Sequence, residues 1–433
     1  NYLKETMHNE LNHICSIKKI DNNNFMWLDG FTIKNLELIY AHNGTSLFDI
    51  LNHCSTHMGS RLLQRWIVLP LIDKEQIDWR LDIVESFLQN TDISEQTAES
   101  LNTIGDLERL VSKIAMMRVQ PNELYALTNI LKEISVIKND FSTSQSTCLQ
   151  QLSKDLKICD DLNEILNKYI SPAAPNNISK GGAIAFGVDE ELDYYRRIST
   201  DAKELINDIL KREIEATGIT SLKISYNNVF GYYLEVTNTH KDKVPESWIR
   251  KQTLTNAERY ITEELKDLET KILNAAEFIS RKESAIYSNL LEQLKKWIEP
   301  LQKNANILSQ IDCLVSFAIV AKHNKYTKPQ ITQDYILNIT EGRHPVIEKT
   351  LPIGTQYISN DVYLDKESSQ IAIITGPNMS GKSAYLRQTA LIVLMAQIGC
   401  YVPALNAQIG IVDKIFTRVG ASDNLSAGES TFM

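Results

Sequence analysis

Apolar residues in the first 170 positions recur every three or four residues, which is the period of a helix with one buried face. Ser46 and Asp49 form a capping-box pattern in front of one such stretch, and a second stretch must end by Pro70. Pro121 occupies a suitable first position for a later helix. The pattern predicts a helical bundle and indicates no function by itself. Further helices are predicted for Ile77 to Leu88, Ile104 to Ile114 and Leu149 to Ile170.

Two longer apolar stripes follow a loop rich in proline and glycine. The first runs from Val188 to Ile209 and ends at Gly218, and the second runs from Ile261 to Ile279 in a helix that ends by Pro300. Thr255 to Glu258 matches a capping box for the second helix. We interpret the stripes as an antiparallel pair of long helices with a small domain at its tip. An ordinary bundle of long helices is the alternative.

The segment between the stripes has the alternating pattern of a β-hairpin. Leu222 to Tyr226 and Tyr232 to Val236 alternate apolar and polar positions around Asn227 and Asn228. Six basic and four acidic residues from 218 to 261 give 6 − 4 = +2, whereas the whole chain carries −9 and the remainder therefore −11. A small sheet with lysines can contact a phosphate backbone without reading bases, although a solvated charged hairpin fits so small a surplus equally well. The candidate DNA-binding residues are Lys241, Lys243, Arg250 and Lys251.

A phosphate-binding loop is the strongest motif in the chain. Ile371 to Thr375 is predicted to be a buried strand, and an apolar-periodic helix is predicted from Tyr385 to Ile398. Between them, the pattern Gly-x-x-x-x-Gly-Lys-Ser at 376–383 turns backbone N–H groups toward an anion at the start of a helix. A glycine-rich turn with an incidental lysine is the alternative, and the flanking pattern argues against it. The candidate ATP-binding residues are Gly376, Pro377, Asn378, Met379, Ser380, Gly381, Lys382 and Ser383.

Two of these residues have distinct chemical roles, and an aromatic residue upstream is a further candidate. Lys382 is expected to reach the β- and γ-phosphates, and the hydroxyl of Ser383 is expected to hold Mg²⁺. Tyr357 is a candidate for stacking on adenine, although a tyrosine in the protein core is the commoner case.

Composition narrows the class of protein. The chain has 433 residues, 43% of them hydrophobic, and we find no apolar run near the ~18 residues that span a bilayer. Six cysteines are scattered without a Cys-x-x-Cys pair, which argues against a zinc site and for reduced thiols. We therefore expect a cytoplasmic protein of two to four domains with no membrane partner. Because the sequence lacks an initial methionine and stops within an apparent element, we also expect it to be a fragment.

Several motifs together resemble the MutS family of DNA mismatch-repair ATPases. The resemblance covers nearly the whole chain and is most specific in its last third. The motifs that carry it are Met58-Gly-Ser-Arg-Leu62, the segment Arg250 to Tyr260, Gly342-Arg-His-Pro-Val-Ile347, the segments Thr375 to Ala390 and Ile398 to Ala404, Ile415-Phe-Thr-Arg-Val-Gly420 and Ser430-Thr-Phe-Met433. The family usually has Gly at the position of Ser380 and Thr at that of Ala384, and we expect both changes to be tolerated.

The resemblance implies a multidomain fold. A mostly α-helical core with long lever helices is expected to carry a small β-rich clamp insertion and a partial α/β P-loop ATPase domain of the ABC type. The expected domains are the end of a connector and the start of the core (1–40), the helical core and first lever helix (41–217), a DNA-contacting clamp (218–256), the second lever helix and core return (257–325) and the N-terminal part of the ATPase domain (326–433).

The resemblance also implies a function and partners. The expected activity is DNA mismatch repair driven by ATP hydrolysis, with ATP or ADP and Mg²⁺ as cofactors and duplex DNA as the main partner. A homodimer is implied, in which Ser430 acts in the partner's nucleotide site. A MutL-type repair partner and a nucleoid-associated localisation are also implied. A MutS-like protein that holds DNA junctions in recombination is one alternative. An SMC-like structural ATPase is another, but helices of about 30 residues, ~45 Å long, are short for it.

The segments that the family uses for mismatch reading and for hydrolysis are not found in this sequence. No Phe-x-Glu wedge occurs, and after Ser383 the only acids are Asp413, Asp423 and Glu429. Asp413 ends an apolar run, but Lys414 follows where a second carboxylate belongs, so we interpret Asp413 as a turn residue. We therefore assign no catalytic residue and expect no useful ATP turnover from this chain.

Overall fold

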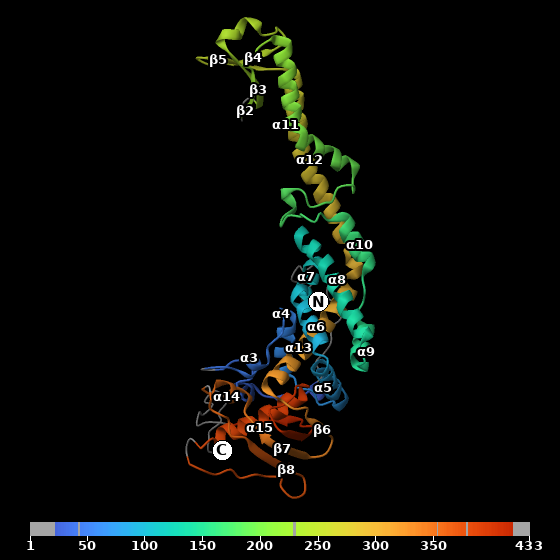
Figure 1. Ribbon diagram of the computed structural model, residues 1–433, viewed down its shortest axis with the longest axis vertical. Helices are drawn as coiled ribbons and strands as arrows, with labels where there is room; N and C mark the ends of the chain where they lie inside the picture. The colour runs from blue at the N-terminus through green and yellow to red at the C-terminus, as the bar shows by residue number, and fades with distance from the viewer. Residues whose placement is uncertain (1–21, 42–43, 228–230, 353, 378–379, 419–433) are drawn as a thin grey trace, which may run out of the picture. The chain divides into compact units, whose positions relative to one another are not determined.

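The computed structural model describes residues 22–41, 44–227, 231–352, 354–377 and 380–418, and it is mostly helical (Figure 1). The chain divides into two compact units. The first unit contains residues 1–116, 129–160 and 296–433, and the second contains residues 117–128 and 161–295. Both units are therefore assembled from segments that are distant in sequence.

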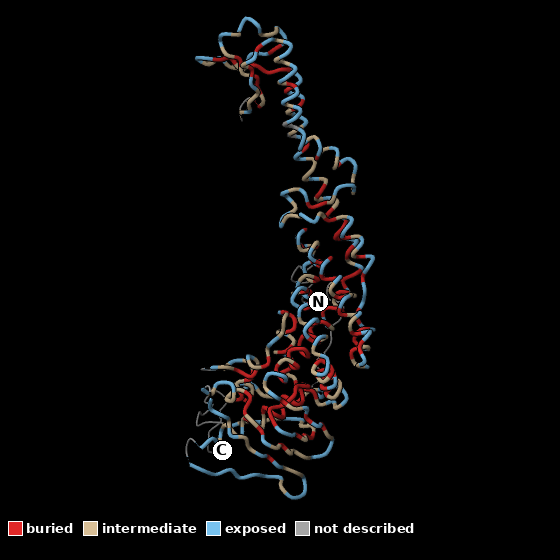
Figure 2. Tube along the Cα trace, in the orientation of Figure 1, coloured by how far each residue is buried: buried red, intermediate tan, exposed pale blue. Residues whose placement is uncertain are grey.

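The first unit is built around one long apolar helix, α13 (Ile298–Asn324). Its side chains are buried along most of its length, including Leu308, Ile311, Leu314 and Phe317, and the surrounding helices pack against it (Figure 2). The surrounding helices are α3 (Leu47–Leu51), α4 (His57–Val68), α5 (Lys74–Gln89), α6 (Thr91–Ile104) and α7 (Leu107–Ala115). The other helices of this bundle are α2 (Gly30–Asn35), α8 (Pro121–Thr143), which contributes residues to both units, and α9 (Thr147–Asp155).

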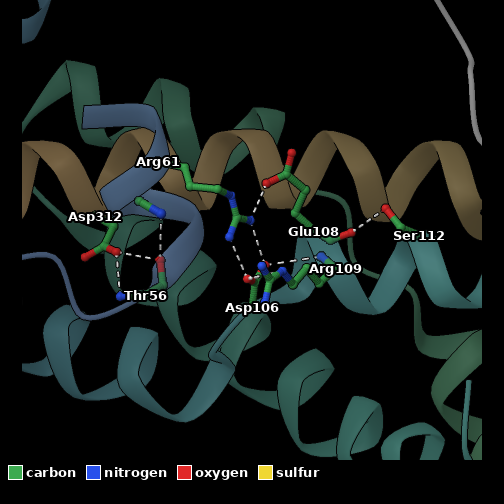
Figure 3. Close-up of polar contacts among 8 residues, drawn as sticks. Thr56, Arg61, Asp106, Glu108, Arg109, Ser112 and Asp312 are labelled. Atoms are coloured by element: carbon green, nitrogen blue, oxygen red, sulfur yellow. Dashed lines mark hydrogen bonds and ion pairs between the residues drawn. The ribbon is translucent and has the colours of Figure 1, made fainter. Parts of the chain in front are cut away.

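Buried polar contacts fix α4 against α13. The carboxylate of Asp312 accepts hydrogen bonds from the Ser55 and Thr56 amides, each at 2.8 Å, and from the Thr56 hydroxyl at 2.6 Å (Figure 3). Gly59 makes this approach possible, because a Cβ at that position would lie 2.2 Å from the Asp312 carboxylate. On the same helix, Arg61 contacts Asp106 at 2.8 Å and Glu108 at 2.6 Å, which connects α4 to the start of α7.

A four-stranded mixed sheet completes the first unit. Its strand order is β6-β9-β7-β8, in which β6 and β9 are parallel and the other pairs are antiparallel. Helix α15 (Lys382–Gln397) contacts β7 and buries most of its second half. A separate parallel pair joins β1 (Trp27–Leu28) to β10 (Lys414–Ile415). The sheet strands and the remaining helix are β6 (Gln330–Thr332), β7 (Ile336–Gly342), β8 (Asn360–Asp365), β9 (Asn406–Gly410) and α14 (Pro345–Thr350).

Two long helices dominate the second unit. Helices α11 (Glu190–Thr217) and α12 (Glu263–Leu294) lie side by side, and α11 ends at Gly218, whose φ of +67° is the left-handed conformation of a helix C-terminus (Figure 1). A buried ion pair between Arg196 and Glu283, at 2.7 Å, joins the two helices. The same Glu283 carboxylate accepts the amides of residues 182 and 183. The predicted pair of long helices is therefore present, together with the short helix α10 (Asp160–Tyr169).

A small antiparallel sheet, which we name the tip sheet, lies between these helices in sequence. Its strand order is β2-β3-β5-β4, and β2 and β3 form the predicted hairpin. Leu234, Val236 and Trp248 pack with Leu265 on α12 in one apolar cluster. A bulge interrupts the edge strand β4 between Arg250 and Gln252. The strands are β2 (Lys223–Asn227), β3 (Gly231–Thr237), β4 (Ile249–Thr253) and β5 (Ala257–Ile261), so the sheet continues past residue 256.

Two predicted helices are in fact broken. The segment from Ile104 to Ile114 is interrupted because Gly105 has φ +65° and Asp106 caps α7 through the Arg109 amide. The segment 149–170 is interrupted after α9, where the Asn304 side chain exchanges two 2.8 Å hydrogen bonds with the backbone of Lys157. Apolar spacing continued across both breaks, and this is why the sequence prediction was wrong there.

The predicted cap of the second long helix is also wrong. Glu258 belongs to strand β5, and α12 begins at Glu263 behind Thr262, whose hydroxyl accepts the Leu265 amide. The prediction that this helix ends by Pro300 is confirmed, since α12 stops at Leu294.

The structure also refines the prediction about apolar runs. One 18-residue window within Glu263–Asn324 reaches a mean hydropathy of 1.4, and 78% of it is buried inside the protein. A core helix has these properties, and α13 is such a helix.

Candidate nucleotide site and basic sheet

Five of the residues predicted to bind phosphate line a pocket in the first unit, and Ser383 does not. Gly381, with φ +88°, directly precedes α15, so the loop turns into the N-terminus of this helix as the motif requires. The pocket has a volume of about 720 Å³. Its lining includes Gly376, Pro377, Ser380, Gly381 and Lys382 from the loop, and Tyr357, Ile358 and Tyr385 from neighbouring segments. The structure therefore brings the predicted loop and Tyr357 together.

The Lys382 side chain folds over its own loop. Its Nζ donates to the carbonyl of Gly376 at 2.5 Å and to that of Pro377 at 2.6 Å. Both acceptors are neutral, so the ammonium charge is hydrogen-bonded but not cancelled. The cation is thus held where the helix N-terminus also favours an anion.

The glycine that the family usually has at 380 is not required by this backbone. Ser380 is not among the described non-glycine residues with positive φ, which are Glu37, Met117, Lys325 and Glu341. Gly376 does have φ +150°, and a Cβ there would lie 3.0 Å from the Ser380 hydroxyl. The expected tolerance for Ser380 therefore agrees with the local geometry.

Four candidate residues remain without a structural test. Ser383 lies exposed in the first turn of α15, and its role toward Mg²⁺ stays a prediction. Asn378, Met379 and Ser430 lie outside the described residues.

The strand predicted in front of the loop is not formed. Residues 371–377 have no regular secondary structure, and Ile371 and Ile373 are 83% and 87% exposed (Figure 2). A buried strand needs hydrogen-bonded neighbours and covered faces, and no strand among the described residues pairs with this segment. The isoleucine-rich run has the composition of a central strand without the neighbours that would bury it.

Tyr357 is held by a residue that the sequence analysis did not identify. Its hydroxyl donates to Oε1 of Gln388 on α15 at 2.9 Å, and burial raises the pKa of Tyr357. Gln388 is fully buried. A polar residue on the apolar face of a predicted helix is the signal that could have found it.

His344 organises the chain next to this pocket. Its Nδ1 accepts the amides of Val346 and Ile347 at 3.3 Å and so caps α14. Burial, followed by the nearby Arg387 charge, lowers the pKa of His344 to about 4. The imidazole is therefore neutral at pH 7 and acts as an acceptor in the Gly342-Arg-His-Pro motif.

The tip sheet arranges its basic residues in two groups. Lys241 and Arg250 both contact Oε1 of Glu258, at 3.0 and 3.4 Å, and the Tyr260 hydroxyl bonds to the other carboxylate oxygen. Glu258 is only 2% exposed. The hydrogen bond from Tyr260, followed by that from Lys241, lowers the pKa of Glu258. Two of the four candidate cations are therefore already paired with a buried anion.

The other two candidate cations are open to solvent. Lys243 and Lys251 are exposed and form no ion pair within the described part of the chain. Lys223, on the edge strand β2, is exposed in the same way and was not assigned by the sequence analysis. Arg259 is paired with Glu235 at 3.3 Å and lies over the Tyr233 ring. The charge available to a phosphate backbone is concentrated in lysines on the periphery of the sheet.

Asp413 has the position expected of a turn residue. Its backbone carbonyl accepts the Trp27 amide at 2.8 Å, and its side chain is 81% exposed. It lines a different pocket from the phosphate loop.

Comparison with known families decides the relationship. Residues 31–318 match the family described as MutS domain III, and residues 372–433 match MutS domain V. The chain belongs to the MutS family. The domain III match includes the helical bundle, both long helices and the tip sheet, and the domain V match includes the phosphate loop.

Individual relatives agree with this assignment. Proteins named DNA mismatch repair protein MutS are 53% identical in Flavobacterium johnsoniae and 52% identical in Parabacteroides distasonis, each over 434 residues. The one from Porphyromonas gingivalis is 49% identical over 435 residues. Each alignment covers 100% of this chain, whereas the chain spans about half the length of these relatives. The resemblance to the MutS family in the sequence analysis is thereby confirmed.

Proposed function

We propose that this chain binds ATP or ADP through residues 376–383 and belongs to a DNA mismatch-repair ATPase. The observation that carries the proposal is the pocket of about 720 Å³ whose lining combines Lys382, at the start of α15, with Tyr357. A helix N-terminus with a lysine suits phosphates, and an aromatic ring suits a base. The names of the MutS relatives favour mismatch repair over the junction-holding and SMC-like alternatives.

Each residue of the loop has a defined task in this proposal. The amides of the loop and the first turn of α15 bind the phosphate oxygens, and Lys382 exchanges its carbonyl contacts for them. Ser383 supplies an exposed oxygen, which is the donor type that Mg²⁺ prefers, and would hold that ion. Bound Mg²⁺ neutralises charge on the phosphates. Tyr357 provides the wall of the pocket against the base.

Calorimetric titration of ATP into the chain and into Lys382→Ala tests the nucleotide proposal. Removing a charge-assisted contact is expected to weaken binding roughly 10- to 100-fold. Lys366→Ala is the matched control, because Lys366 is a lysine of the same unit that does not line the pocket. Equal affinities of the wild type and Lys382→Ala would refute the assignment.

The second part of the proposal is that the tip sheet contacts the phosphates of duplex DNA without reading bases. The exposed lysines and the small apolar core of the sheet support it. Neutralising two or three phosphates predicts a slope of log K against log[salt] of roughly −2 to −3. Replacing Lys241, Lys243, Arg250 and Lys251 by Ala is expected to flatten this slope, and an unchanged slope would contradict DNA contact here.

The remaining expectations for the whole protein follow from family membership and stay proposals. They are a cytoplasmic, nucleoid-associated homodimer, hydrolysis of ATP, a MutL-type partner and a role of Ser430 across the dimer. A domain order with a core (41–217), a clamp (218–256) and an ATPase segment (326–433) also belongs to this proposal.

A further inference from the structure

A fully buried glutamine lies on the helix that begins at the phosphate loop. Gln388 is six positions after Lys382 on α15 (388 − 382 = 6), and its side chain is 0% exposed. Its Oε1 accepts the Tyr357 hydroxyl at 2.9 Å and lies 3.5 Å from Nδ2 of Asn360. Its Nε2 has no hydrogen-bond partner within the described residues. An amide that is buried and half-satisfied is costly, so its retention calls for a reason.

Neighbouring residues fix the orientation of the Gln388 side-chain amide. Nδ2 of Asn360 donates to the Ile358 carbonyl at 3.1 Å, which identifies this atom as an amide nitrogen. The same nitrogen faces Gln388, so the atom of Gln388 that points toward it must be the acceptor Oε1. Gly342 provides the space on the other side, because a Cβ there would lie 2.6 Å from Nε2 of Gln388. Gly342 does not have positive φ, so at this position glycine is needed for space rather than for backbone conformation.

The Tyr357 hydroxyl uses its single donor on Gln388. Tyr357 lines the pocket, whereas Gln388 does not. The O–H donor of the tyrosine is therefore used by the protein, and the ring is the part of the side chain that suits a ligand in the pocket. An aromatic ring in a fixed position suits stacking on a nucleobase and does not suit hydrogen bonding to phosphate or ribose.

We propose that Gln388 is a positioning residue for nucleotide recognition, which holds the Tyr357 ring as a stacking wall for the base of a nucleoside triphosphate. This inference rests on the proposed function of the same pocket. Because Gln388 and Lys382 belong to one helix, the base and the phosphates are read from a single rigid element. Without this hydrogen bond the Tyr357 ring can rotate. Ordering the ring then costs conformational entropy when the nucleotide binds, which weakens the affinity.

Comparing ATP with inorganic triphosphate tests the proposal in the full chain. Tyr357→Phe and Gln388→Met each remove the hydrogen bond while retaining the size of the side chain. Each is expected to weaken ATP binding about 3- to 10-fold and to leave triphosphate binding unchanged. Because both variants remove the same contact, the double variant is expected to be no weaker than either single variant.

Gln397→Met is the matched structural control on the same helix. Gln397 is also 0% exposed, and its amide exchanges hydrogen bonds with Leu71 and Val412 at 2.7 to 3.0 Å. This variant is expected to lower the melting temperature without changing the ratio of ATP to triphosphate affinity. A purely structural role of Gln388 would give the same pattern for Gln388→Met.

Three results would overturn the inference. Equal weakening of ATP and triphosphate by Gln388→Met would assign Gln388 to helix stability. Additive effects of the two single variants, or an unchanged ATP affinity of Tyr357→Phe, would separate the hydroxyl from base binding. Tyr357→Phe keeps the ring and tests the contact even where Gln388→Met fails to fold. Failure of the wild type to bind either ligand would refute the proposed nucleotide function and this inference with it.

Discussion

Two buried carboxylates, one in each unit, are stabilised by opposite kinds of hydrogen-bond partner. Asp312 in α13 is 1% exposed, and its hydrogen-bond donors among the described residues are neutral, namely two amides and one hydroxyl. Glu258 in the tip sheet is 2% exposed and contacts two cations and a phenol. Burial raises the pKa of Asp312, whereas hydrogen bonds from Tyr260 and Lys241 lower the pKa of Glu258.

The difference shows what each carboxylate contributes. Asp312 positions the start of α4 against α13, and it does so with a charge that its surroundings disfavour. Glu258 is a favoured charge that organises the tip sheet, but it also cancels basic charge on which the proposed DNA contact would depend. A buried anion can therefore stabilise a binding surface and reduce its attraction for the ligand at the same time.

Among the variants in this comparison, removing Asp312 is expected to have the largest effect on local stability. Asp312→Ala leaves three donors without an acceptor, and we expect a loss of about 2–4 kcal/mol in the local stability of the first unit. Hydrogen exchange at the Ser55 and Thr56 amides measures it. Ser309→Ala is the control on the same helix, because that buried hydroxyl bonds only to the Asn306 carbonyl. Comparable losses in both variants would show that Asp312 has no special role.

The two groups of basic residues in the tip sheet are expected to differ in their effect on DNA binding. Lys243→Ala with Lys251→Ala removes two free cations and should make the salt slope shallower by about 1.8, at ~0.9 per phosphate. Lys241→Ala with Arg250→Ala should change the slope less, because Glu258 already engages both. Glu258→Gln should release them and steepen the slope. Equal slope changes for the two pairs would show that Glu258 does not withhold its partners from DNA.

The two carboxylates should also respond to acid with opposite signs. The folded pKa of Glu258 lies below its ordinary 4.5, so its stabilisation is complete above that pH and is lost as the pH falls through the folded value. The folded pKa of Asp312 lies above its ordinary 3.8, so acidification through that raised value removes a penalty. Local hydrogen exchange from pH 7 to 3 is the measurement. As the pH falls, the local stability of the wild type should decrease relative to Glu258→Gln and increase relative to Asp312→Asn. Changes in the same direction would refute the comparison.

Asp413 should have the smallest effect. Its side chain is 81% exposed, and among the described residues the ion pair that it forms is with the adjacent Lys414, at 4.0 Å. Asp413→Asn is therefore expected to leave nucleotide affinity and melting temperature unchanged. A loss of Mg²⁺-dependent ATP affinity in this variant would show that the acid reaches the nucleotide site.

Local signals in the sequence predicted the elements that depend on local contacts. The capping box at Ser46 is confirmed, with the Asp49 amide at 3.2 Å and the Ser46 amide at 2.9 Å from their acceptors. The hairpin of β2 and β3 and the end of α11 at Gly218 are confirmed for the same reason. In each case the residues that determine the structure lie within a few positions of one another.

Contacts between distant residues could not be predicted in this way. Thr255 to Glu258 matches the residue pattern of a capping box, but Glu258 lies in strand β5 and pairs with Lys241, 17 positions earlier in the chain. The break after α9 depends on Asn304, 147 residues away from Lys157. In the nucleotide pocket, the loop and Tyr357 were found from sequence, whereas the contact of Gln388 depends on a partner 31 residues upstream.

The bulge in strand β4 has a consequence for how two copies of the tip sheet can meet. An edge strand exposes unpaired N–H and C=O groups, to which the edge of another sheet can add. Between Arg250 and Gln252 the regular ladder is interrupted, and the extra residue there is the exposed Lys251. A charged side chain at a bulge is an effective barrier to such addition. Tip sheets brought close together, as on the proposed DNA partner, are thus kept from pairing edge to edge along β4.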